Sequence, residues 1–437
     1  MSFLIFKRSL ATLSKSTSFP RPGPTSNSGL ASSLRFSSGE EFRGVSFGCD
    51  STPVTSGEVV FTTSVVGYPE SMTDPSYHGQ ILVFTQPIIG NYGVPAPSVD
   101  KFGLFKHFES GKIQVSGIIV NDYAAKYSHW NAIESLGNWC AREGIPAISG
   151  IDTRAVVTLL RDFGSKTGHI SIGQDAIASP MPDYVSDSSN WIANVSSNDI
   201  KVYNSAGNIK IALIDCGAKQ NIIRCLVQRG AQVTVFPHDF DFSSTLEQYD
   251  GVFISNGPGT TILLGEMLTH IGDPLSAKPT ISTVSNVLSK SASMRFPIPV
   301  FGICMGHQVL GLAAGYKSYK LPFGNRGHNQ PALDLVKGGC VITSQNHGYA
   351  LDDSKTPQGW QTYFRNANDG SNEGIKHKTL PFSSVQFHPE AMGGPLDTQY
   401  LFEDFLKEVE AFKEMRSGVN VVSPFMAQSA KSISLNA

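Results

Sequence analysis

The stretch from Ile298 to Gly315, IPVFGICMGHQVLGLAAG, decides the fold of the second half of the chain. It reads as an apolar strand to Phe301, a turn around Cys304, and a helix with one apolar face. Gly302 and Gly306 permit the sharp strand-to-helix turn that holds a nucleophile above a sheet. A helix N-terminus also favours the thiolate form of a cysteine. The pattern therefore predicts a nucleophile elbow that carries sulfur, and a buried structural cysteine is the alternative.

The residues before this elbow alternate between strand and helix patterns. Buried strands are expected at IKIALIDCG (209–217), AQVTVFPHD (231–239) and YDGVFISNGPG (249–259), and a helix at NIIRCLVQRG (221–230). This order predicts an α/β domain with a doubly wound, mostly parallel sheet. Such sheets bind ligands at the carboxyl ends of their strands, so the loops at Asp215, Pro237 and Gly257 are candidate site loops.

Length and composition divide the chain further. The 437 residues exceed one ordinary core, and an amino-terminal α+β domain is expected before the elbow domain. In that first domain, GEVVFTTSVVGY (57–68) is typical of a strand and HWNAIESLGNWCAREG (129–144) of a helix. The expected divisions are a leader (1–39), the α+β domain (40–197), a linker (198–208), the doubly wound domain (209–415) and a flexible tail (416–437).

The first 39 residues are basic and rich in serine and threonine. No acidic residue precedes Glu40, and Arg35 lies near the end of the segment. This composition predicts a mitochondrial transit peptide that is cleaved near Arg35, and hence a protein of the matrix; a disordered tail is the alternative.

Charge and cysteine usage limit the classes of partner. The net charge of −2 gives no basic field for nucleic acid or an anionic membrane, and no segment approaches about 20 uninterrupted apolar residues. The six cysteines are scattered without metal-ligand spacing, so neither a metal site nor a disulfide framework is expected. Small-molecule and protein partners remain.

An acid–base pair is predicted in SVQFHPEAMGGP (384–395). Alternate residues of a strand face one way, which allows Glu390 to orient His388 while His388 faces Cys304. His307 follows the elbow and is the alternative base, but it lies on the wrong side of the turn. An α/β-hydrolase with sulfur as nucleophile is a second enzyme class, although its acid usually precedes a lone histidine.

Several motifs together resemble known proteins. FGICMGHQ (301–308), QNHGY (345–349) and QFHPE (386–390) are similar to class I (triad) glutamine amidotransferases. LIDCGAKQNIIR (213–224), GYPESMTDPSY (67–77) and GIDTRAVVTLLR (150–161) resemble the glutaminase small subunits of carbamoyl phosphate synthetases. FTQPIIGNYGVP (84–95) and KYSHW (126–130) have the look of the fungal arginine-pathway form. The resemblance covers about Phe42 to Phe412.

The resemblance implies a role for each matching residue. Cys304 would form a γ-glutamyl thioester, His388 would act as general acid and base, and Glu390 would orient it. The backbone N–H groups of Met305 and Gly257 would form the oxyanion hole. The positions implied to bind glutamine are Ser76, Gly257, Gly259, Met305, Gln308, Asn346, Gly348 and Tyr349.

The resemblance also implies a partner. The chain has no glycine-rich phosphate loop, so ATP and Mg²⁺ would be bound by a separate large synthetase subunit that receives the ammonia. No cofactor is expected in this chain.

One motif departs from the family pattern. The family reads SNGPGDP without interruption, whereas here Asp273-Pro274 follows Gly259 only after the apolar segment 260–272. An artefact of the gene model or of splicing is the favoured interpretation, and an evolved loop is the other. If the insertion disrupts the oxyanion turn, the chain would be a catalytically impaired docking or regulatory subunit. The GNRGHNQPA stretch (324–332) is a second departure, because bacterial relatives are richer in histidine there.

Overall fold

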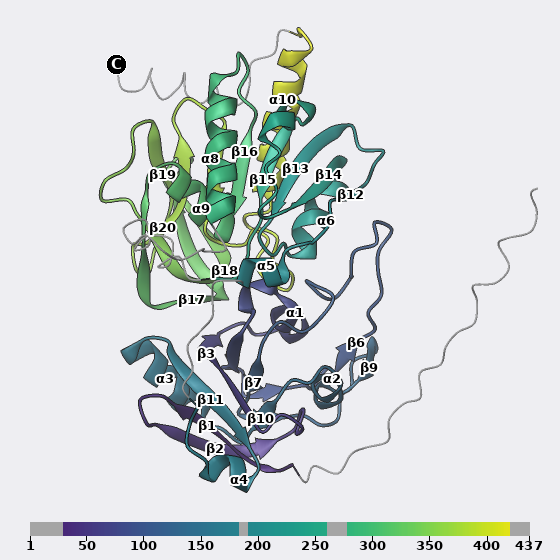
Figure 1. The fold of residues 1–437 in the computed structure, drawn as a ribbon, viewed down its shortest axis with the longest axis vertical. Helices are drawn as coiled ribbons and strands as arrows, with labels where there is room; N and C mark the ends of the chain where they lie inside the picture. Colours follow the sequence, from purple (N-terminus) through teal and green to yellow (C-terminus); the bar gives the residue numbers. More distant parts are fainter. Residues whose placement is uncertain (1–28, 183–190, 260–277, 420–437) are drawn as a thin grey trace, which may run out of the picture.

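The computed structural model describes residues 29–182, 191–259 and 278–419. They form an amino-terminal barrel domain and a carboxy-terminal sheet domain, which meet at one end of the large sheet (Figure 1). The predicted insertion at 260–272, most of the leader and most of the tail lie outside the described residues.

The first domain is built on a closed barrel. Its strand order is β1-β11-β3-β4-β7-β10-β2, and its interior is filled by apolar side chains such as Leu34, Val59, Ile81 and Ile170. The barrel strands are β1 (Ala31–Phe36), β2 (Glu41–Ser46), β3 (Val54–Thr62), β4 (Gln80–Phe84), β7 (Gly117–Ile119), β10 (Ala147–Ser149) and β11 (Lys166–Ile172). Two small sheets pair β5 (Ile88–Ile89) with β8 (Asp122–Tyr123) and β6 (Val94–Pro95) with β9 (Ala132–Glu134). The helices are α1 (Tyr68–Thr73), η1 (Pro75–Tyr77), α2 (Leu136–Arg142), α3 (Thr153–Phe163) and α4 (Gln174–Ala178).

Strand β1 corrects the predicted leader boundary. Residues 31–36 pair with both β2 and β11, and Leu34 and Phe36 are fully buried. The Arg35 guanidinium donates hydrogen bonds to the carbonyls of Ile177 (3.1 Å) and Ser179 (2.8 Å). In the structure the barrel domain therefore begins by Ala31, before the predicted boundary at residue 39, and cleavage near Arg35 would remove a strand on which barrel closure depends. The short basic strand resembled the leader in composition alone.

The helix predicted at 129–144 is also shorter than expected. Ser135 caps α2 by accepting a hydrogen bond from the Asn138 N–H at 3.2 Å, so the helix begins at Leu136. The residues before the cap form β9 instead.

The second domain confirms the predicted α/β class. Its 10-stranded sheet has the order β12-β14-β13-β15-β16-β21-β20-β19-β17-β18. The strands are β12 (Lys201–Tyr203), β13 (Ile209–Asp215), β14 (Ala231–Pro237), β15 (Gly251–Ile254), β16 (Val300–Ile303), β17 (Lys317–Asp334), β18 (Cys340–Asp352), β19 (Trp360–Asn366), β20 (Asn372–His377) and β21 (Phe382–Val385). The five strands from β14 to β21 are parallel, and the remaining pairs are antiparallel. The sheet is thus mixed, since long hairpin strands extend its parallel centre.

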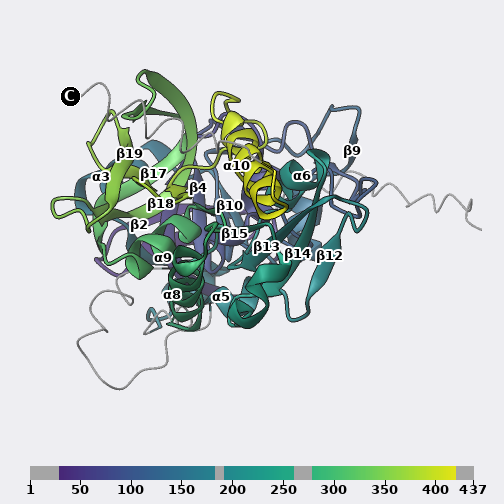
Figure 2. The same ribbon diagram turned by 90° about the horizontal axis from the view of Figure 1, so that it is seen from above.

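Helices cover both faces of the parallel centre. α6 (Gln220–Gln228) and α10 (Tyr400–Arg416) pack on one face, while α8 (Lys278–Ser293) and α9 (Met305–Ala313) pack on the other (Figure 2). The short helix η3 (Ser243–Gln248) packs on the same face as α8 and α9. Each face is a continuous apolar core, which explains why the central strands read as unbroken hydrophobic runs. None of the described helices is both long and apolar enough to cross a membrane.

The predicted linker contains ordered structure. The helix α5 (Trp191–Val195) precedes it and packs Ile192 into the core of the second domain. Strand β12 lies within the predicted range and pairs antiparallel with β14 as an edge strand. The polar composition of this region reflects an exposed edge strand rather than a free connector.

Candidate active site

Cys304 sits at the predicted elbow between β16 and α9. Its backbone has φ of 54°, which is unusual for a residue with a side chain. A Cβ on Gly302 would lie 2.6 Å from the Gly306 carbonyl oxygen, and one on Gly306 would lie 2.2 Å from the Ile254 carbonyl oxygen. Only glycine fits either position, so the two glycines let α9 turn sharply and pack against β15 with the sulfur above the sheet edge.

His388 and Glu390 follow the end of the adjacent strand β21. His388 Nδ1 lies 2.7 Å from Glu390 Oε1, and both side chains are buried. Burial and the Lys219 ammonium lower the pKa of His388, but the Glu390 carboxylate and Cys304 prevail and raise it to about 10. Burial raises the pKa of Glu390, yet His388 and Lys219 bring it down to about 2. The pair is therefore an imidazolium–carboxylate pair, and Nε2 is the ring nitrogen left for Cys304.

Lys219 and Asp74 extend this pair across the domain boundary, and sequence reasoning missed both. Lys219 Nζ lies 3.3 Å from Glu390 Oε1, 3.3 Å from His388 Nδ1 and 3.2 Å from Asp74 Oδ2. All of these groups are buried. The one available signal was that Lys219 follows the carboxyl end of β13, where site residues gather. Asp74 belongs to the barrel domain, so the ion pairs tie both domains to the acid–base pair.

A pocket opens beside the sulfur. All of the residues predicted to bind glutamine line it, together with Cys304: Ser76, Gly257, Gly259, Met305, Gln308, Asn346, Gly348 and Tyr349. Ser76 comes from the barrel domain and accepts a hydrogen bond from Asn256 Nδ2 at 2.9 Å. A Cβ on Gly257 would lie 2.0 Å from the Cys216 carbonyl oxygen, so glycine is required at that turn. The two proposed oxyanion donors, Met305 and Gly257, thus border the same space as the sulfur.

Two polar atoms on the pocket wall lack protein partners within the described residues. Gln308 Oε1 and Asn346 Nδ2 are buried and accept or donate no hydrogen bond there. Such atoms are costly unless a ligand or water satisfies them. An acceptor and a donor are what a ligand with an ammonium and a carboxylate requires. The pocket also includes Arg326, which sequence reasoning did not select.

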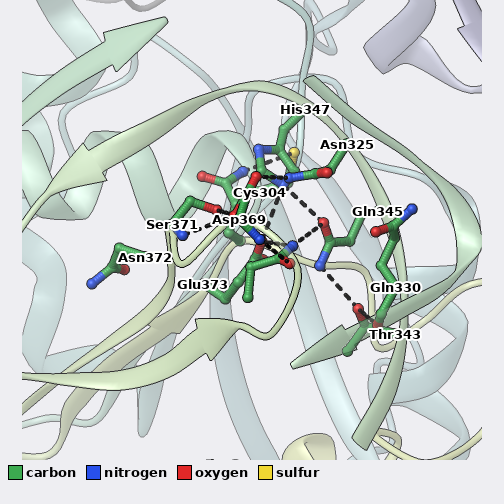
Figure 3. A network of polar contacts seen from close by, with 12 residues as sticks. Cys304, Asn325, Gln330, Thr343, Gln345, His347, Asp369, Ser371, Asn372 and Glu373 are labelled. Atoms are coloured by element: carbon green, nitrogen blue, oxygen red, sulfur yellow. Dashed lines mark hydrogen bonds and ion pairs between the residues drawn. The ribbon is translucent and has the colours of Figure 1, made fainter. Parts of the chain in front are cut away.

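A second buried histidine–glutamate pair supports this wall (Figure 3). His347 Nε2 lies 3.5 Å from Glu373 Oε1, and Nδ1 donates to the Tyr349 carbonyl at 2.8 Å. Gln345 Oε1 lies 3.2 Å from the same Nε2, and Asn366 Nδ2 donates to Glu373 at 3.0 Å. Both ring nitrogens of His347 are thereby engaged, and the contacts hold the β18 segment that forms the pocket wall.

His307, the alternative base, has a neutral ring that is engaged by another residue. Its Nδ1 is 2.9 Å from Ser384 Oγ, and burial lowers the pKa of His307 to about 3. His388 is thus the histidine whose charge and position suit acid–base chemistry at Cys304. Within the described residues no group of three or more His, Cys, Asp and Glu side chains is arranged to hold a metal ion. The arrangement suits attack of sulfur on a carbonyl carbon next to an imidazolium proton donor.

Comparison with known proteins agrees with this geometry. A model of class-I glutamine amidotransferases matches residues 212–408, and a model of the CPSase domain of carbamoyl-phosphate synthase small chains matches residues 34–170. The arginine-specific small chain of carbamoyl phosphate synthase from Neurospora crassa is 51% identical over 407 residues, which cover 92% of this chain and 85% of the relative. The corresponding protein of Schizosaccharomyces pombe is 49% identical over 408 residues, 93% of each chain. A solved glutamine amidotransferase from Thermotoga maritima is 15% identical, with a TM-score of 0.32 over 52% of this chain and 92% of its own, and supports no conclusion by itself. The identity and coverage of the fungal relatives show that the chain belongs to the carbamoyl phosphate synthase small-chain family, with a class-I glutamine amidotransferase domain.

Proposed function

We propose that this chain hydrolyses L-glutamine at Cys304 and delivers ammonia to a large carbamoyl phosphate synthase subunit. The observation that carries the proposal is the elbow cysteine beside the buried His388–Glu390 pair, in a chain that matches both small-chain family models. The fungal relatives are named arginine-specific, which supports a role in arginine biosynthesis.

The first half-reaction forms the thioester. The Cys304 thiolate attacks the side-chain amide carbon of glutamine, and the carbonyl π electrons move to oxygen. The N–H groups of Met305 and Gly257 border this pocket and are the proposed donors to the oxyanion. As the intermediate collapses, the His388 imidazolium gives its proton to the departing nitrogen, which leaves as ammonia.

The second half-reaction restores the enzyme. Neutral His388 takes a proton from water as the water oxygen attacks the thioester carbon, and the carbon–sulfur bond breaks to release glutamate and the Cys304 thiolate. Glu390 stabilises the imidazolium at each stage through its 2.7 Å contact with Nδ1. The net change is hydrolysis of glutamine to glutamate and ammonia.

The synthetic half of the reaction belongs to the partner. ATP and Mg²⁺ would be bound by the large subunit, which would combine bicarbonate with the ammonia to make carbamoyl phosphate. The name "small chain" of the relatives supports a heterodimeric assembly.

The Cys304→Ser variant tests the proposal in the assembled complex. Glutamine-dependent synthesis should disappear, and ammonia-dependent synthesis should persist, because only the thioester step needs sulfur. Loss of both activities would contradict separate sites for hydrolysis and synthesis.

A catalytically impaired docking or regulatory role is the second candidate. It is favoured by the interrupted SNGPG…DP motif, whose segment 260–272 lies outside the described residues. Comparing glutamine hydrolysis by complexes with and without residues 260–272 separates the two functions. Inactivity of the full chain and activity of the shortened chain would support the second.

We also propose a mitochondrial matrix location. The basic, acid-free amino-terminal composition supports it. We place the proposed cleavage before Ala31, so that the barrel strand β1 is kept. Mass spectrometry of the endogenous amino terminus tests this proposal. An intact leader on a cytosolic protein would contradict it, whereas a mature chain that begins after residue 31 would contradict only the cleavage position.

A further inference from the structure

Gln386 is a buried glutamine that contacts the sulfur of the elbow cysteine. Its Nε2 donates a hydrogen bond to Cys304 Sγ over 3.7 Å, and the side chain, 1% exposed, belongs to the wall of the pocket. Neither half-reaction of the proposed mechanism uses this side chain, although it touches the reacting atom.

The end of β21 places Gln386 on the same side of the chain as His388. The backbone N–H of Gln386 donates to the Glu373 carbonyl at 2.8 Å, which fixes the chain just after the strand. Phe387, between the two residues, is fully buried in the apolar core, as expected where successive side chains point to opposite sides. One strand end therefore presents both an amide donor and the proton-transferring histidine to Cys304.

The orientation of the Gln386 amide is fixed by Gln308. Gln308 lies one turn after Cys304 on α9, where its N–H donates to the Cys304 carbonyl at 3.1 Å. Its Nε2 donates to Gln386 Oε1 and also to the Tyr349 carbonyl at 3.4 Å. A reversed Gln386 amide would set two NH2 groups against each other and lose the bond from Gln308. The NH2 group of Gln386 is thus left facing the sulfur.

The sulfur has two polar contacts with opposite preferences. As a thiol, Cys304 donates to the Asn346 carbonyl at 3.7 Å. A thiolate has no proton for that carbonyl, but it still accepts the hydrogen bond from Gln386. A hydrogen bond to the charged form of a group favours that form, and such bonds are stronger than those between neutral groups. The Gln386 amide therefore favours the thiolate.

We propose that Gln386 is a catalytic residue that stabilises the Cys304 thiolate, both when sulfur attacks and when it leaves the thioester. The inference rests on the proposed function, in which the thiolate begins the first half-reaction and ends the second. His388 gives and takes the proton, whereas Gln386 stabilises the charge that remains on sulfur. Gln308 acts here as a positioning residue, because it reaches the sulfur only through Gln386.

Alkylation of Cys304 by iodoacetamide tests the sulfur directly. The complex with its large subunit is treated at neutral pH, and mass spectrometry follows modification of the peptide that carries Cys304. Gln386→Met keeps the length of the side chain but has no donor. Alkylation should therefore slow about tenfold, the lower end of the range for a hydrogen bond to a charged group. Gln386→Glu keeps the acceptor for Gln308 but replaces the donor with a second acceptor, so it should slow alkylation at least as much.

Ser384→Ala is the matched control variant. Ser384 lies two residues earlier on the same strand, and its Oγ contacts His307 Nδ1 at 2.9 Å rather than the sulfur. This variant also loses one buried hydrogen bond, so it would reveal any general effect of such a loss. The alkylation rate of Cys304 should stay unchanged in it.

Steady-state kinetics connect the sulfur to turnover. In the Gln386→Met complex, kcat for glutamine hydrolysis should fall about tenfold with little change in KM, because the lost contact is to the nucleophile. Ammonia-dependent synthesis by the same complex should persist and shows that the variant is folded and assembled.

The alkylation results separate this inference from the proposed function, because iodoacetamide reacts without glutamine turnover. Slow alkylation of both Gln386 variants would support the contact even if the unmodified complex failed to hydrolyse glutamine. Unchanged alkylation in these variants, or equal slowing in Ser384→Ala, would overturn the assignment and leave the proposed hydrolysis at Cys304 intact.

Discussion

The second domain contains two buried histidine–glutamate pairs, His388–Glu390 and His347–Glu373, and they differ in whether the histidine keeps a ring nitrogen without a partner. In the first pair, Glu390 engages only Nδ1 of His388, and the second ring nitrogen remains for Cys304. In the second pair, Nδ1 of His347 donates to the Tyr349 carbonyl and Nε2 faces Gln345 and Glu373. The first arrangement can transfer a proton at the sulfur, whereas the second holds a strand. Burial beside a glutamate therefore does not identify a catalytic histidine. His388 is distinguished by a second ring nitrogen without a partner among the described residues and by a pKa that Glu390 and Cys304 raise.

The largest expected effect comes from the first pair. His388→Asn removes the proton donor for the departing ammonia, so kcat for glutamine hydrolysis should fall on the order of 1000-fold. Steady-state kinetics of the complex measure this loss, with ammonia-dependent synthesis as the control. A fall of less than tenfold would mean that another group moves the proton.

Glu390→Gln keeps the shape of the orienting group but removes its charge. The loss in kcat should be smaller than for His388→Asn, about 10- to 100-fold, because the ring can still transfer a proton. Equal losses in the two variants would show that Glu390 and His388 do not act as orienter and base.

The same substitution should change stability in a pH-dependent way. The folded-state pKa of His388 is raised from its ordinary 6.5 to about 10, so its charge stabilises the fold fully below pH 6.5. That contribution declines as the pH rises through 10. The pKa of Glu390 is lowered from 4.5 to about 2, so its contribution is complete above pH 4.5 and is lost as the pH falls through 2.

Thermal unfolding of the unmodified and Glu390→Gln proteins across pH 5 to 9.5 measures this dependence. The difference in Tm should be largest near pH 5 to 6.5 and should shrink toward the alkaline end. A difference that grows with pH would contradict the imidazolium–carboxylate pair.

The smallest expected effect comes from the second pair. Glu373→Gln leaves an acceptor for Asn366 and keeps the bond from His347 to the Tyr349 carbonyl. The KM for glutamine should rise by about fivefold, the scale of one weakened hydrogen bond, while kcat changes by less than about twofold. A loss confined to kcat would place the second pair in the chemistry and would remove the distinction between the two pairs.

The sequence was sufficient to predict the residues of the site that react, because each lies in a short and recognisable sequence pattern. Cys304 lies within a strand–turn–helix pattern, and His388 and Glu390 are two residues apart after a strand. The fold class of the second domain followed from the same alternation of strands and helices. These features depend on short-range geometry that a linear pattern records.

The residues that support the site, and the first strand of the barrel, could not be predicted from the sequence, because only tertiary contacts reveal their roles. Asp74 and Lys219 are far apart in sequence and meet only across the domain boundary. Strand β1 was mistaken for leader because its burial depends on pairing with β2 and β11 rather than on its composition. Arg326 was passed over because a cation in a polar stretch resembles an exposed loop until the pocket shows it buried.

The most direct test of the central claim is to locate the covalent intermediate. The complex would be mixed with isotopically labelled glutamine, quenched in acid within its first turnovers, digested, and analysed by mass spectrometry. We predict a labelled γ-glutamyl group on the peptide that carries Cys304, which disappears when excess unlabelled glutamine is added before the quench. Ammonia release with no label on Cys304 at any quench time, or with the label on another cysteine, would contradict the account.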